Sequence, residues 1–421
     1  YTIDDLRDVL SQDRIPENFP KPPPRDEVGP YVLAADEVCH VGEAVAVVIA
    51  DSRYRAEDAA QLVAVEYDPL PATGDPRAAA GDGAPPVNRR SGDNIVGRYA
   101  LATGEVDAAF ERAAHVVSAS LRQHRGCSLP MECRGSVVRY DPRRRRLTMW
   151  SSTQAPHGHK SILVSLFGLA ESDVRVIVPS VGGGFGPKLL FYPEDGAIAA
   201  AAIKLGRPVK YIEDRREHLM CTTQERDQFW EVEMAADDEG RILGLRGTLY
   251  HDQGAYTARG TNIPFSSATT ILGPYVVPHY RMNVVIAHTN KVAATSMRGA
   301  GHPQGCFTME RLLDRMAAKT GIDRAEIRTR NMIRLNQMPY EHPLRTQAGQ
   351  KIVYDSGDYA KCQADLLTAI DYAGFAERQR AARAEGRYLG IGIANYVKPT
   401  GRGPFETGLV RIGTSGRVMV Y

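Results

Sequence analysis

The order of apolar and polar positions along the chain predicts many short strands separated by a few helices and glycine-rich turns. Short apolar or alternating runs are typical of strands. We expect strands at 44–50, 64–67, 174–178 and 282–287, strand-like structure across 116–150, and a hairpin over 228–256 that turns at Asp238-Glu239-Gly240. Because helices are mixed with these strands along the chain, the pattern indicates an α+β fold.

Helical spacing and end signals mark further segments. We expect helices at 52–63 and 161–167, one that begins near Pro193 and stops at Gly206, and one at 304–319. Proline is tolerated in a first turn, and glycine is a frequent residue just after a helix end. In the last helix, apolar side chains recur every three or four positions, so we expect it to dock on a core. These side chains are Cys306, Met309, Leu313, Met316 and Ala317.

Changes in composition along the chain predict the domain limits. Residues 31–70 have the pattern of a small α+β unit, and 71–93 are rich in Ala, Gly, Pro and Asp without an apolar period. We expect a small domain at 1–75, a linker at 76–105, a first large domain at 106–335 and the start of a second large domain at 336–421. Within the last part, 388–421 predict a strand, a glycine-rich turn and a hairpin around Ser415-Gly416.

Length, composition and charge narrow the class of protein. A chain of 421 residues is too long for one ordinary core, and 43% hydrophobic with 24% charged residues is typical of globular proteins. The formal charge of +2 provides no overall field for nucleic acid or a membrane, and the basic run at 143–146 is interpreted as a solvated hairpin turn. No apolar run reaches the ~18 residues of a membrane span. The six cysteines include no Cys-x-x-Cys pair, which favours a reducing, cytoplasmic setting.

The strongest local signal is a glycine-rich loop, Val181-Gly182-Gly183-Gly184-Phe185-Gly186-Pro187-Lys188, between an expected strand and an expected helix. Glycines at this density let the backbone approach a bulky anionic ligand with its amide groups exposed, as phosphate or a pyranopterin requires. The loop is not a P-loop, because Leu189 stands where Ser or Thr would hold magnesium, and Pro187 breaks the dinucleotide-binding pattern. A purely structural turn is the alternative to a cofactor cradle.

Two further segments carry polar side chains at the ends of elements. Gln154 closes an expected strand, and its amide can donate to a ligand oxygen; an ordinary turn residue is the alternative. Arg298 lies among glycines just before the last long helix, where it can hold a carboxylate, phosphate or oxyanion; an ordinary salt bridge is the alternative. His157 and His159 have no third ligand at suitable spacing and are interpreted as surface or loop residues, so no metal-binding residue is predicted. Hydrolase motifs such as Gly-x-Ser-x-Gly and His-Glu-x-x-His are absent from the sequence.

In this order and at these separations, the segments around Gln154, 181–188 and Arg298 resemble the molybdopterin-binding large subunit of the molybdenum hydroxylases, the family of xanthine dehydrogenase, aldehyde oxidase and aerobic carbon monoxide dehydrogenase. Supporting stretches run along most of the chain. The segments 41–46 and 65–67 resemble the family's N-terminal hammerhead domain, and 206–210, 252–256 and 328–332 also match its pattern. The resemblance implies that 1–75 is a hammerhead domain, followed by molybdopterin-binding domains of mixed sheets and helices.

The resemblance also implies a molybdenum–molybdopterin cofactor, usually the cytosine dinucleotide form in bacteria. Such enzymes hydroxylate their substrate with oxygen from water and pass the electrons to iron–sulfur clusters and FAD. No cysteine spacing here fits a cluster, so those centres would lie on a small iron–sulfur subunit and a medium FAD-binding subunit. A cofactor-free or nucleotide-binding homologue without activity is the alternative.

By carry-over from the family, each motif receives a role. Gln154 would hydrogen-bond an oxygen ligand of molybdenum, and Arg298 would lie beside the substrate or cofactor. The cofactor would be bound by the backbone of Gly183, Gly184, Phe185 and Gly186.

Three positions depart from the family's patterns and bear on the substrate. Gly299 stands where the carbon monoxide enzymes carry their copper-binding Cys. Leu189 and Ala300 stand where the xanthine enzymes carry a substrate-binding Glu and an aromatic residue that stacks on the purine. The resemblance therefore favours an aldehyde or an N-heteroaromatic substrate over carbon monoxide or a purine.

The family's sequences continue into a Gly-Gln-Gly loop and a Glu that acts as general base, and this sequence contains neither. We expect a fragment of a longer chain, which we prefer, or a naturally split subunit completed by a second molybdopterin-binding chain. Neither Glu310 nor Glu406 is assigned as the base.

Overall fold

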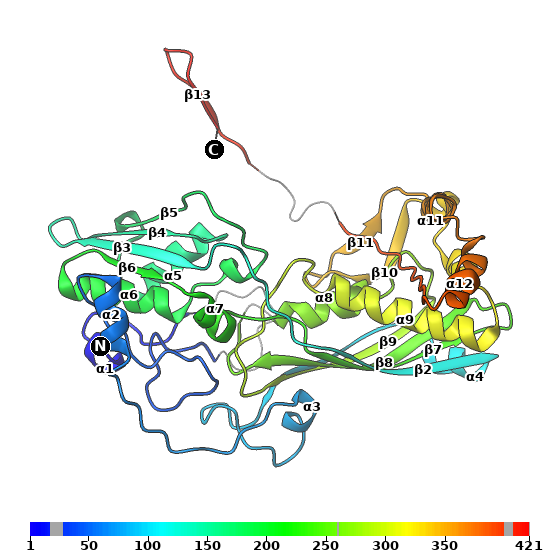
Figure 1. The fold of residues 1–421 in the computed structure, drawn as a ribbon, viewed down its shortest axis with the longest axis horizontal. Helices are drawn as coiled ribbons and strands as arrows, with labels where there is room; N and C mark the ends of the chain where they lie inside the picture. Colours follow the sequence, from blue (N-terminus) through cyan, green and yellow to red (C-terminus); the bar gives the residue numbers. More distant parts are fainter. Residues whose placement is uncertain (17–27, 259–260, 400–406, 421) are drawn as a thin grey trace.

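The computed structural model describes residues 1–16, 28–258, 261–399 and 407–420. Its body consists of two α+β units that lie side by side, each built on one sheet (Figure 1). The mixed sheets and helices confirm the expected fold class. Among the described helices, none has the length and apolar character needed to cross a membrane.

The first unit is built on a four-stranded sheet in the order β5-β4-β3-β6, in which only β4 and β5 run parallel. Its strands are β3 (Gly135–Asp141), β4 (Arg146–Ser151), β5 (Val174–Ile177) and β6 (Val209–Ile212). Helices α5 (Pro156–Phe167) and α6 (Pro193–Leu205) share one core with this sheet, and α7 (Arg215–Cys221) follows β6. As predicted, α6 begins at Pro193 and is capped by Gly206, whose φ is +61°. The β3–β4 connection confirms the turn expected at 143–146.

The N-terminal segment packs against this first unit. Helix α1 (Ile3–Leu6) contacts α6, and α2 (Arg53–Ala60) lies within the helix expected at 52–63. The strands expected at 44–50 and 64–67 are wrong, because the structure forms no strand at either segment. A strand needs a hydrogen-bonding ladder. Val47 bonds only to Tyr1 in this way, and residues 61–70 are exposed.

The second unit is built on a five-stranded sheet in the order β1-β9-β8-β7-β2, in which only β8 and β9 run parallel. Its strands are β1 (Ile95–Thr103), β2 (His115–Gln123), β7 (Gln228–Ala236), β8 (Ile242–Gly254) and β9 (His279–His288). Helices α8 (Asn262–Thr270) and α9 (His302–Thr320) pack on it, and the side chains of Met309, Leu313 and Met316 are buried in its core as predicted. The hairpin expected over 228–256 is β7 and β8.

The linker expected at 76–105 needs a correction. Its first part holds the single-turn helix α3 (Pro76–Ala79), but its last part is β1, which is an edge strand of the five-stranded sheet. Burial along β1 alternates between partly buried and exposed positions, and within this strand only Val96 is fully buried, so its apolar signal is weak and its pattern resembled a linker. Helix α4 (Val106–Glu111) then connects β1 to β2.

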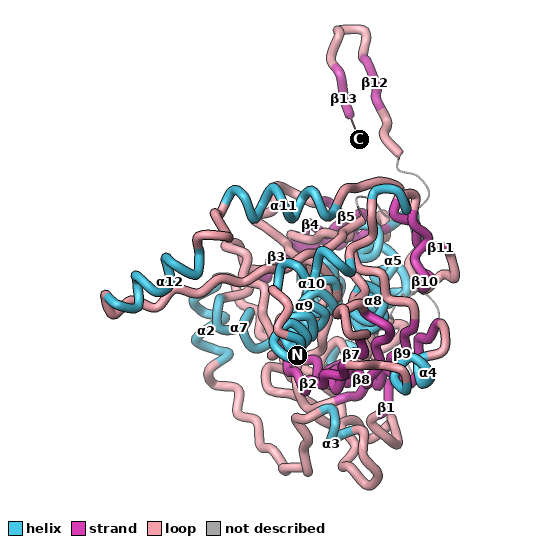
Figure 2. The backbone as a smooth tube through the Cα atoms, turned by 90° about the vertical axis from the view of Figure 1, so that its right-hand side faces the viewer, coloured by secondary structure: helices cyan, strands magenta, loops and turns pink. Residues whose placement is uncertain are grey.

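The remaining elements follow α9. They are α10 (Arg324–Asn331), β10 (Tyr340–Arg345), β11 (Lys351–Tyr354), α11 (Tyr359–Ala369), α12 (Phe375–Ala384), β12 (Val410–Ile412) and β13 (Val418–Val420), with short 3-10 turns at Glu171–Asp173, Pro187–Leu189 and Leu335–Gln337. The β12–β13 hairpin has the turn expected at Ser415-Gly416 and stands away from the body (Figures 1 and 2). The strand expected from 388 onward is wrong for 388–399, which pair with no other strand in the described chain.

Candidate cofactor-binding site

The three motifs identified in the sequence meet in the structure at the junction of the two units. Gln154 follows β4 and the glycine-rich loop 181–186 follows β5, both in the first unit. Arg298 precedes α9 of the second unit. Gln154, Phe185 and Arg298 are all exposed. The loops therefore present these side chains at the surface, where a ligand can reach them.

Gln154 is joined to the glycine-rich loop by its backbone and by its side chain. Its N–H donates to the Lys188 carbonyl at 2.8 Å, and its Oε1 accepts from the Gly186 N–H at 2.9 Å. Because the amide oxygen is used in this bond, Nε2 is the group that is left to donate to a ligand. A Cβ on Gly184 would lie 2.4 Å from Gln154 Oε1, so a larger residue would displace the glutamine.

The glycine-rich loop also contacts the Arg298 segment directly. Gly186 has a φ of +120°, and a Cβ there would lie 2.0 Å from the Ser296 carbonyl oxygen. The Arg298 N–H donates to the Phe185 carbonyl at 2.9 Å, and its guanidinium carbon lies 5.1 Å from the centre of the Phe185 ring. Phe185 itself has a φ of +58°, a conformation that costs a non-glycine residue ~1 kcal/mol or more. The glycine-rich loop and the Arg298 segment are thus in direct contact.

An ion pair between buried Lys188 and partly exposed Glu132 anchors the glycine-rich loop from behind. The Nζ of Lys188, whose side chain is fully buried, lies 2.7 Å from Glu132 Oε2. The Gly182 N–H donates to the same carboxylate oxygen at 2.7 Å. Burial opposes a charge on Glu132, but the Lys188 ammonium and the Gly182 amide hold the pKa of this carboxyl below its usual range. Lys188 therefore forms a structural ion pair.

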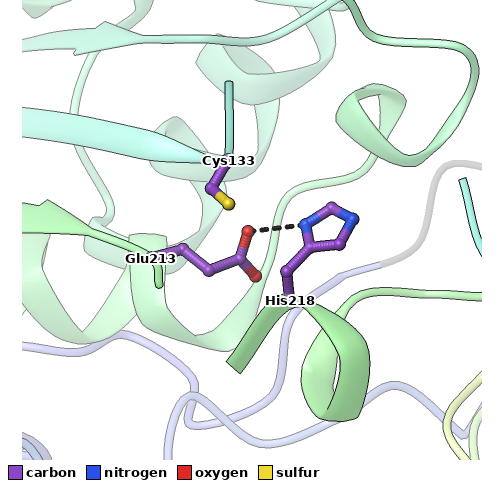
Figure 3. A group of neighbouring side chains, drawn as sticks. All are labelled: Cys133, Glu213 and His218. Carbon is purple, nitrogen blue, oxygen red and sulfur yellow. Dashed lines mark hydrogen bonds and ion pairs between the residues drawn. The ribbon is translucent and has the colours of Figure 1, made fainter. Parts of the chain in front are cut away.

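Beside this anchor lies a cluster of Cys133, Glu213 and His218, whose potential ligand atoms are all within 4.8 Å of one another (Figure 3). These residue types bind metals, but both ring nitrogens of His218 already have hydrogen-bond partners. Its Nδ1 lies 2.8 Å from Glu213 Oε2 and its Nε2 lies 2.7 Å from the Ser128 carbonyl oxygen. An imidazole with an acceptor at each nitrogen is protonated at both and offers no lone pair to a metal. We interpret the cluster as structural.

The charges in this cluster compensate one another. Burial opposes the protonated ring, but hydrogen bonds from His218 to Cys127, Glu213 and Ser128 raise the pKa of His218 to about 9. Burial likewise opposes the ionised Glu213, but His218 and the Arg134 guanidinium lower the pKa of Glu213 to about 2. Arg134 also pairs with Glu194 of α6 at 3.2 Å, so the cluster ties β6 and α7 to α6.

Other residues considered in the sequence have structural surroundings. His157 is exposed as predicted, but His159 is wrong as a surface residue, because it lies buried in α5 with Nδ1 3.2 Å from Thr153 Oγ1, and burial lowers its pKa. Glu310 is buried and 2.6 Å from Arg328 Nε. Glu406 lies outside the described residues. Leu189 lines a largely apolar cavity of about 160 Å³.

The sequence did not identify the residues that support the loops. These are Glu132, Arg134, Lys188 in its ion pair, Glu213 and His218. Glu132 lies 56 positions before Lys188, and Arg134 lies 79 positions before Glu213. No local pattern in a single sequence indicates pairing over such separations, so no signal available there would have found them.

Comparison with protein families matches two stretches of the chain. The family described as "Molybdopterin cofactor-binding domain" matches residues 87–332, and the one described as "Aldehyde oxidase and xanthine dehydrogenase, a/b hammerhead domain" matches residues 3–71. Both stretches follow the order expected from the sequence.

Curated relatives and solved structures give the same classification. The chain is 38% identical over 384 residues to the nicotine 6-hydroxylase large subunit of Paenarthrobacter nicotinovorans, covering 90% of this chain and 46% of that one. It is 36% identical over 397 residues to the carbon monoxide dehydrogenase large chain of Hydrogenophaga pseudoflava, covering 89% and 48%. Its structure matches quinoline 2-oxidoreductase from Pseudomonas putida 86 with a TM-score of 0.89 at 32% identity, covering 100% and 54%. The chain thus spans about half the length of the curated relatives it matches. It belongs to the molybdopterin-binding large subunits of the molybdenum hydroxylase family.

Proposed function

We propose that this chain is the part of a molybdenum hydroxylase that binds one side of a molybdenum–molybdopterin cofactor, in an enzyme that oxidises an aldehyde or an N-heteroaromatic compound. The observation that carries the proposal is the junction of the two loops at Gly186, with Gln154 and Arg298 exposed beside it. These two side chains come from different units, and their contacts with one glycine-rich loop hold them in one place.

The residues at this junction fit a bulky anionic cofactor. At Gly184 and Gly186 any Cβ would collide with Gln154 or with Ser296, so the loop can pack beside these residues only with glycine at both positions. Arg298 contributes a positive charge and Gln154 a free amide donor. Exposed amide groups and one cation are the partners that phosphate-bearing ligands require.

When bound, the cofactor supplies the redox chemistry, with oxygen derived from water. The chain's own residues position the cofactor and the substrate and polarise the substrate. In this proposal Gln154 Nε2 would donate a hydrogen bond to the cofactor, and the backbone from Gly183 to Gly186 would pack on it. Arg298 orients the carbonyl oxygen or ring nitrogen of the substrate through its guanidinium, which Phe185 holds in place.

The proposed substrate class rests on the side chains at positions 189 and 300 and on the names of two relatives. Leu189 is apolar and cannot provide the hydrogen bond expected of a purine site. Ala300 is small and cannot provide the stacking ring. Two of the relatives are named for the hydroxylation or oxidation of nitrogen-ring compounds, nicotine and quinoline. These names favour the N-heteroaromatic alternative over the aldehyde.

The proposal extends to the domains and partners of the whole protein. We assign 1–75 to the hammerhead domain, 106–335 together with β1 to the first molybdopterin-binding domain and 336–421 to the start of the second. The cofactor would be the cytosine dinucleotide form, and a small iron–sulfur subunit and a medium FAD-binding subunit would receive the electrons. Related large subunits are named as parts of a complex, which supports partner chains.

Metal analysis of the complete complex tests the cofactor. The full-length chain is expressed with its partner subunits in a host that makes the cofactor, and molybdenum and iron are measured per complex. We expect close to one molybdenum together with iron. A complex that folds and assembles without molybdenum would favour the cofactor-free or nucleotide-binding alternative.

A substrate panel tests the reaction. Quinoline, nicotinate, a substituted benzaldehyde and xanthine are compared by kcat/KM with an artificial electron acceptor. We expect one of the first three to be the best substrate, because a site without the polar partners of a substrate discriminates strongly against it. Xanthine as the best substrate would contradict the interpretation of Leu189 and Ala300, though not the cofactor.

A further inference from the structure

Glu225 is a fully buried carboxyl group directly behind the Arg298 loop. Its backbone pairs with Gly126 through two hydrogen bonds of 2.9 Å. The preceding residue, Gln224, accepts from the Thr295 N–H at 2.8 Å. Thr295 begins the short segment that leads to Arg298, and the Met297 amide of that segment faces the Glu225 side chain. The carboxyl therefore touches the backbone that carries Arg298.

The Glu225 carboxyl has no well-formed hydrogen bond within the described chain at either oxygen, although both are buried. Arg226 Nε lies 2.7 Å from Oε1, but its geometry is not that of a hydrogen bond. Burial raises the pKa of Glu225 to about 7, against the opposing effects of Arg226 and the Met297 amide. A buried acid with so little compensation is uncommon in a structure in which Glu132 and Glu213 are both fully paired.

The backbone beside Glu225 is strained. Arg226 and Asp227 have φ values of +67° and +56°, and neither is glycine. Consecutive left-handed residues persist only where their surroundings enforce them. Here Asp227 is held by Arg125 at 3.1 Å and by Lys291 at 2.8 Å. These ion pairs hold the strained backbone that directly follows Glu225.

The other charged and titratable groups near Glu225 interact with other residues. Arg125 and Lys291 both bind Asp252 in addition to Asp227. The Cys127 thiol contacts the Ser128 carbonyl oxygen and His218, and Arg298 lies over the Phe185 ring. Within the part of the chain that the structure describes, Arg226 is thus the one charged side chain that faces the carboxyl.

We propose that Glu225 is a positioning residue, whose neutral carboxyl supports the segment from Thr295 to Arg298 and whose ionisation displaces that segment and with it Arg298. The inference rests on the proposed function of Arg298 as a substrate-orienting residue. An ionised carboxylate in this place would draw the Met297 amide inward and would reorient the Arg226 guanidinium, already 2.7 Å away, into hydrogen-bonding geometry, because nothing else compensates its charge. Affinity for substrate would then depend on the protonation of a group that never contacts it.

The test uses the full-length chain in its complete complex. Glu225→Gln is isosteric and permanently neutral, and the matched control is Glu171→Gln, whose side chain is 80% exposed. KM and kcat are measured from pH 5.5 to 9 with quinoline, or with the best substrate of the panel, and apparent melting temperatures are recorded over the same range. We expect the wild-type KM to rise about 10-fold above pH 7, with a smaller change in kcat, and Glu225→Gln to abolish this rise.

Melting provides a readout that needs no turnover. A folded-state pKa raised from 4.5 to about 7 means that wild-type stability falls as pH rises from 4.5 to about 7 and is level above it, whereas the glutamine variant has no such group. The melting temperature of Glu225→Gln should therefore rise relative to that of the wild type between pH 5.5 and 7 and keep a constant difference up to pH 8.5, whereas Glu171→Gln should follow the wild type throughout.

A second variant protects the test if Glu225→Gln fails to assemble. Arg226→Gln removes the cation that opposes the shift, so the midpoints of the KM and melting profiles should both move to higher pH. Unchanged midpoints there, or a Glu225→Gln profile parallel to the wild type, would overturn the inference. A wild-type complex without molybdenum would instead overturn the proposed function, and the melting profiles would still decide whether Glu225 titrates as inferred.

Discussion

Gly186→Ala is expected to separate the two loops that form the proposed site. A Cβ at this position would lie 2.0 Å from the Ser296 carbonyl oxygen and 2.8 Å from Met297 Cα, whereas such contacts essentially never fall below 3.0 Å. The Ser296–Arg298 segment must therefore retreat by about 1 Å, and a misplacement of ~1 Å can cost ~10²-fold in rate. The φ of +120° adds a strain of ~1–3 kcal/mol. We expect turnover on the best substrate of the panel to fall about 100-fold, with molybdenum retained.

Gly206→Ala is the matched control, because it separates backbone strain from loop displacement. Gly206 caps α6 with a φ of +61°, and no atom lies within 4 Å of the Cβ it would acquire. The substitution should cost ~1–2 kcal/mol of stability and leave turnover unchanged. Both variants are compared in the full complex by steady-state kinetics, molybdenum content and melting. Wild-type turnover in Gly186→Ala, or an equal loss in Gly206→Ala, would refute the argument that contact between the loops positions the site.

Three further predictions concern single side chains. Gln154→Ala should lower turnover ~10²-fold and cost only ~1 kcal/mol of stability, because the exposed side chain gives up its hydrogen bond from the Gly186 N–H; unchanged turnover would identify a simple turn residue. Glu310→Ala leaves the buried Arg328 without its closest partner and should destabilise the protein by ~3–5 kcal/mol in denaturant unfolding; a loss under ~1 kcal/mol would contradict this. The folded pKa of His218 is raised from 6.5 to about 9, so its stabilisation is complete below pH 6.5 and is lost as pH rises through 9. Wild-type melting should therefore approach that of His218→Gln between pH 7 and 9, and parallel curves would exclude a charged ring.

Elements with complete local signals were predictable from the sequence. Helix α6 has Pro193 in its first turn and Gly206 after its end, and the hairpin of β7 and β8 turns where polar residues and Gly240 interrupt the apolar pattern. Segment 44–50 carries an equally good strand pattern, but a strand exists only where a neighbour completes its hydrogen bonds. Because that partner is not encoded in the segment itself, its apolar pattern alone predicted the wrong structure.

The residues of the candidate site also fall into those that the sequence identified and those that it did not. Gln154, the glycine-rich loop and Arg298 were identified as candidates from their local sequence, a resemblance to a family gave them roles, and the structure brings all three together. Their proposed roles toward the cofactor stay predictions. The buried pairs behind the loops depend on contacts between residues far apart in the sequence, and no helical or strand periodicity encodes them.

The distribution of charge around the loops explains why these buried pairs matter for an anionic ligand. Three carboxyl groups lie close behind the proposed site, and each is neutralised in a different way. Glu132 is paired with Lys188, Glu213 with Arg134 and His218, and Glu225 through the raised pKa that burial imposes. An uncompensated carboxylate at any of these places would repel a phosphate-bearing cofactor through a medium of low dielectric constant, where charges act over longer distances than in water. The exposed face meanwhile offers amide donors and the Arg298 guanidinium. The ion pairs that anchor the glycine-rich loop therefore also cancel the negative charge of these acids, and a substitution that frees one of them should lower the molybdenum content of the complex even where the loops keep their shape.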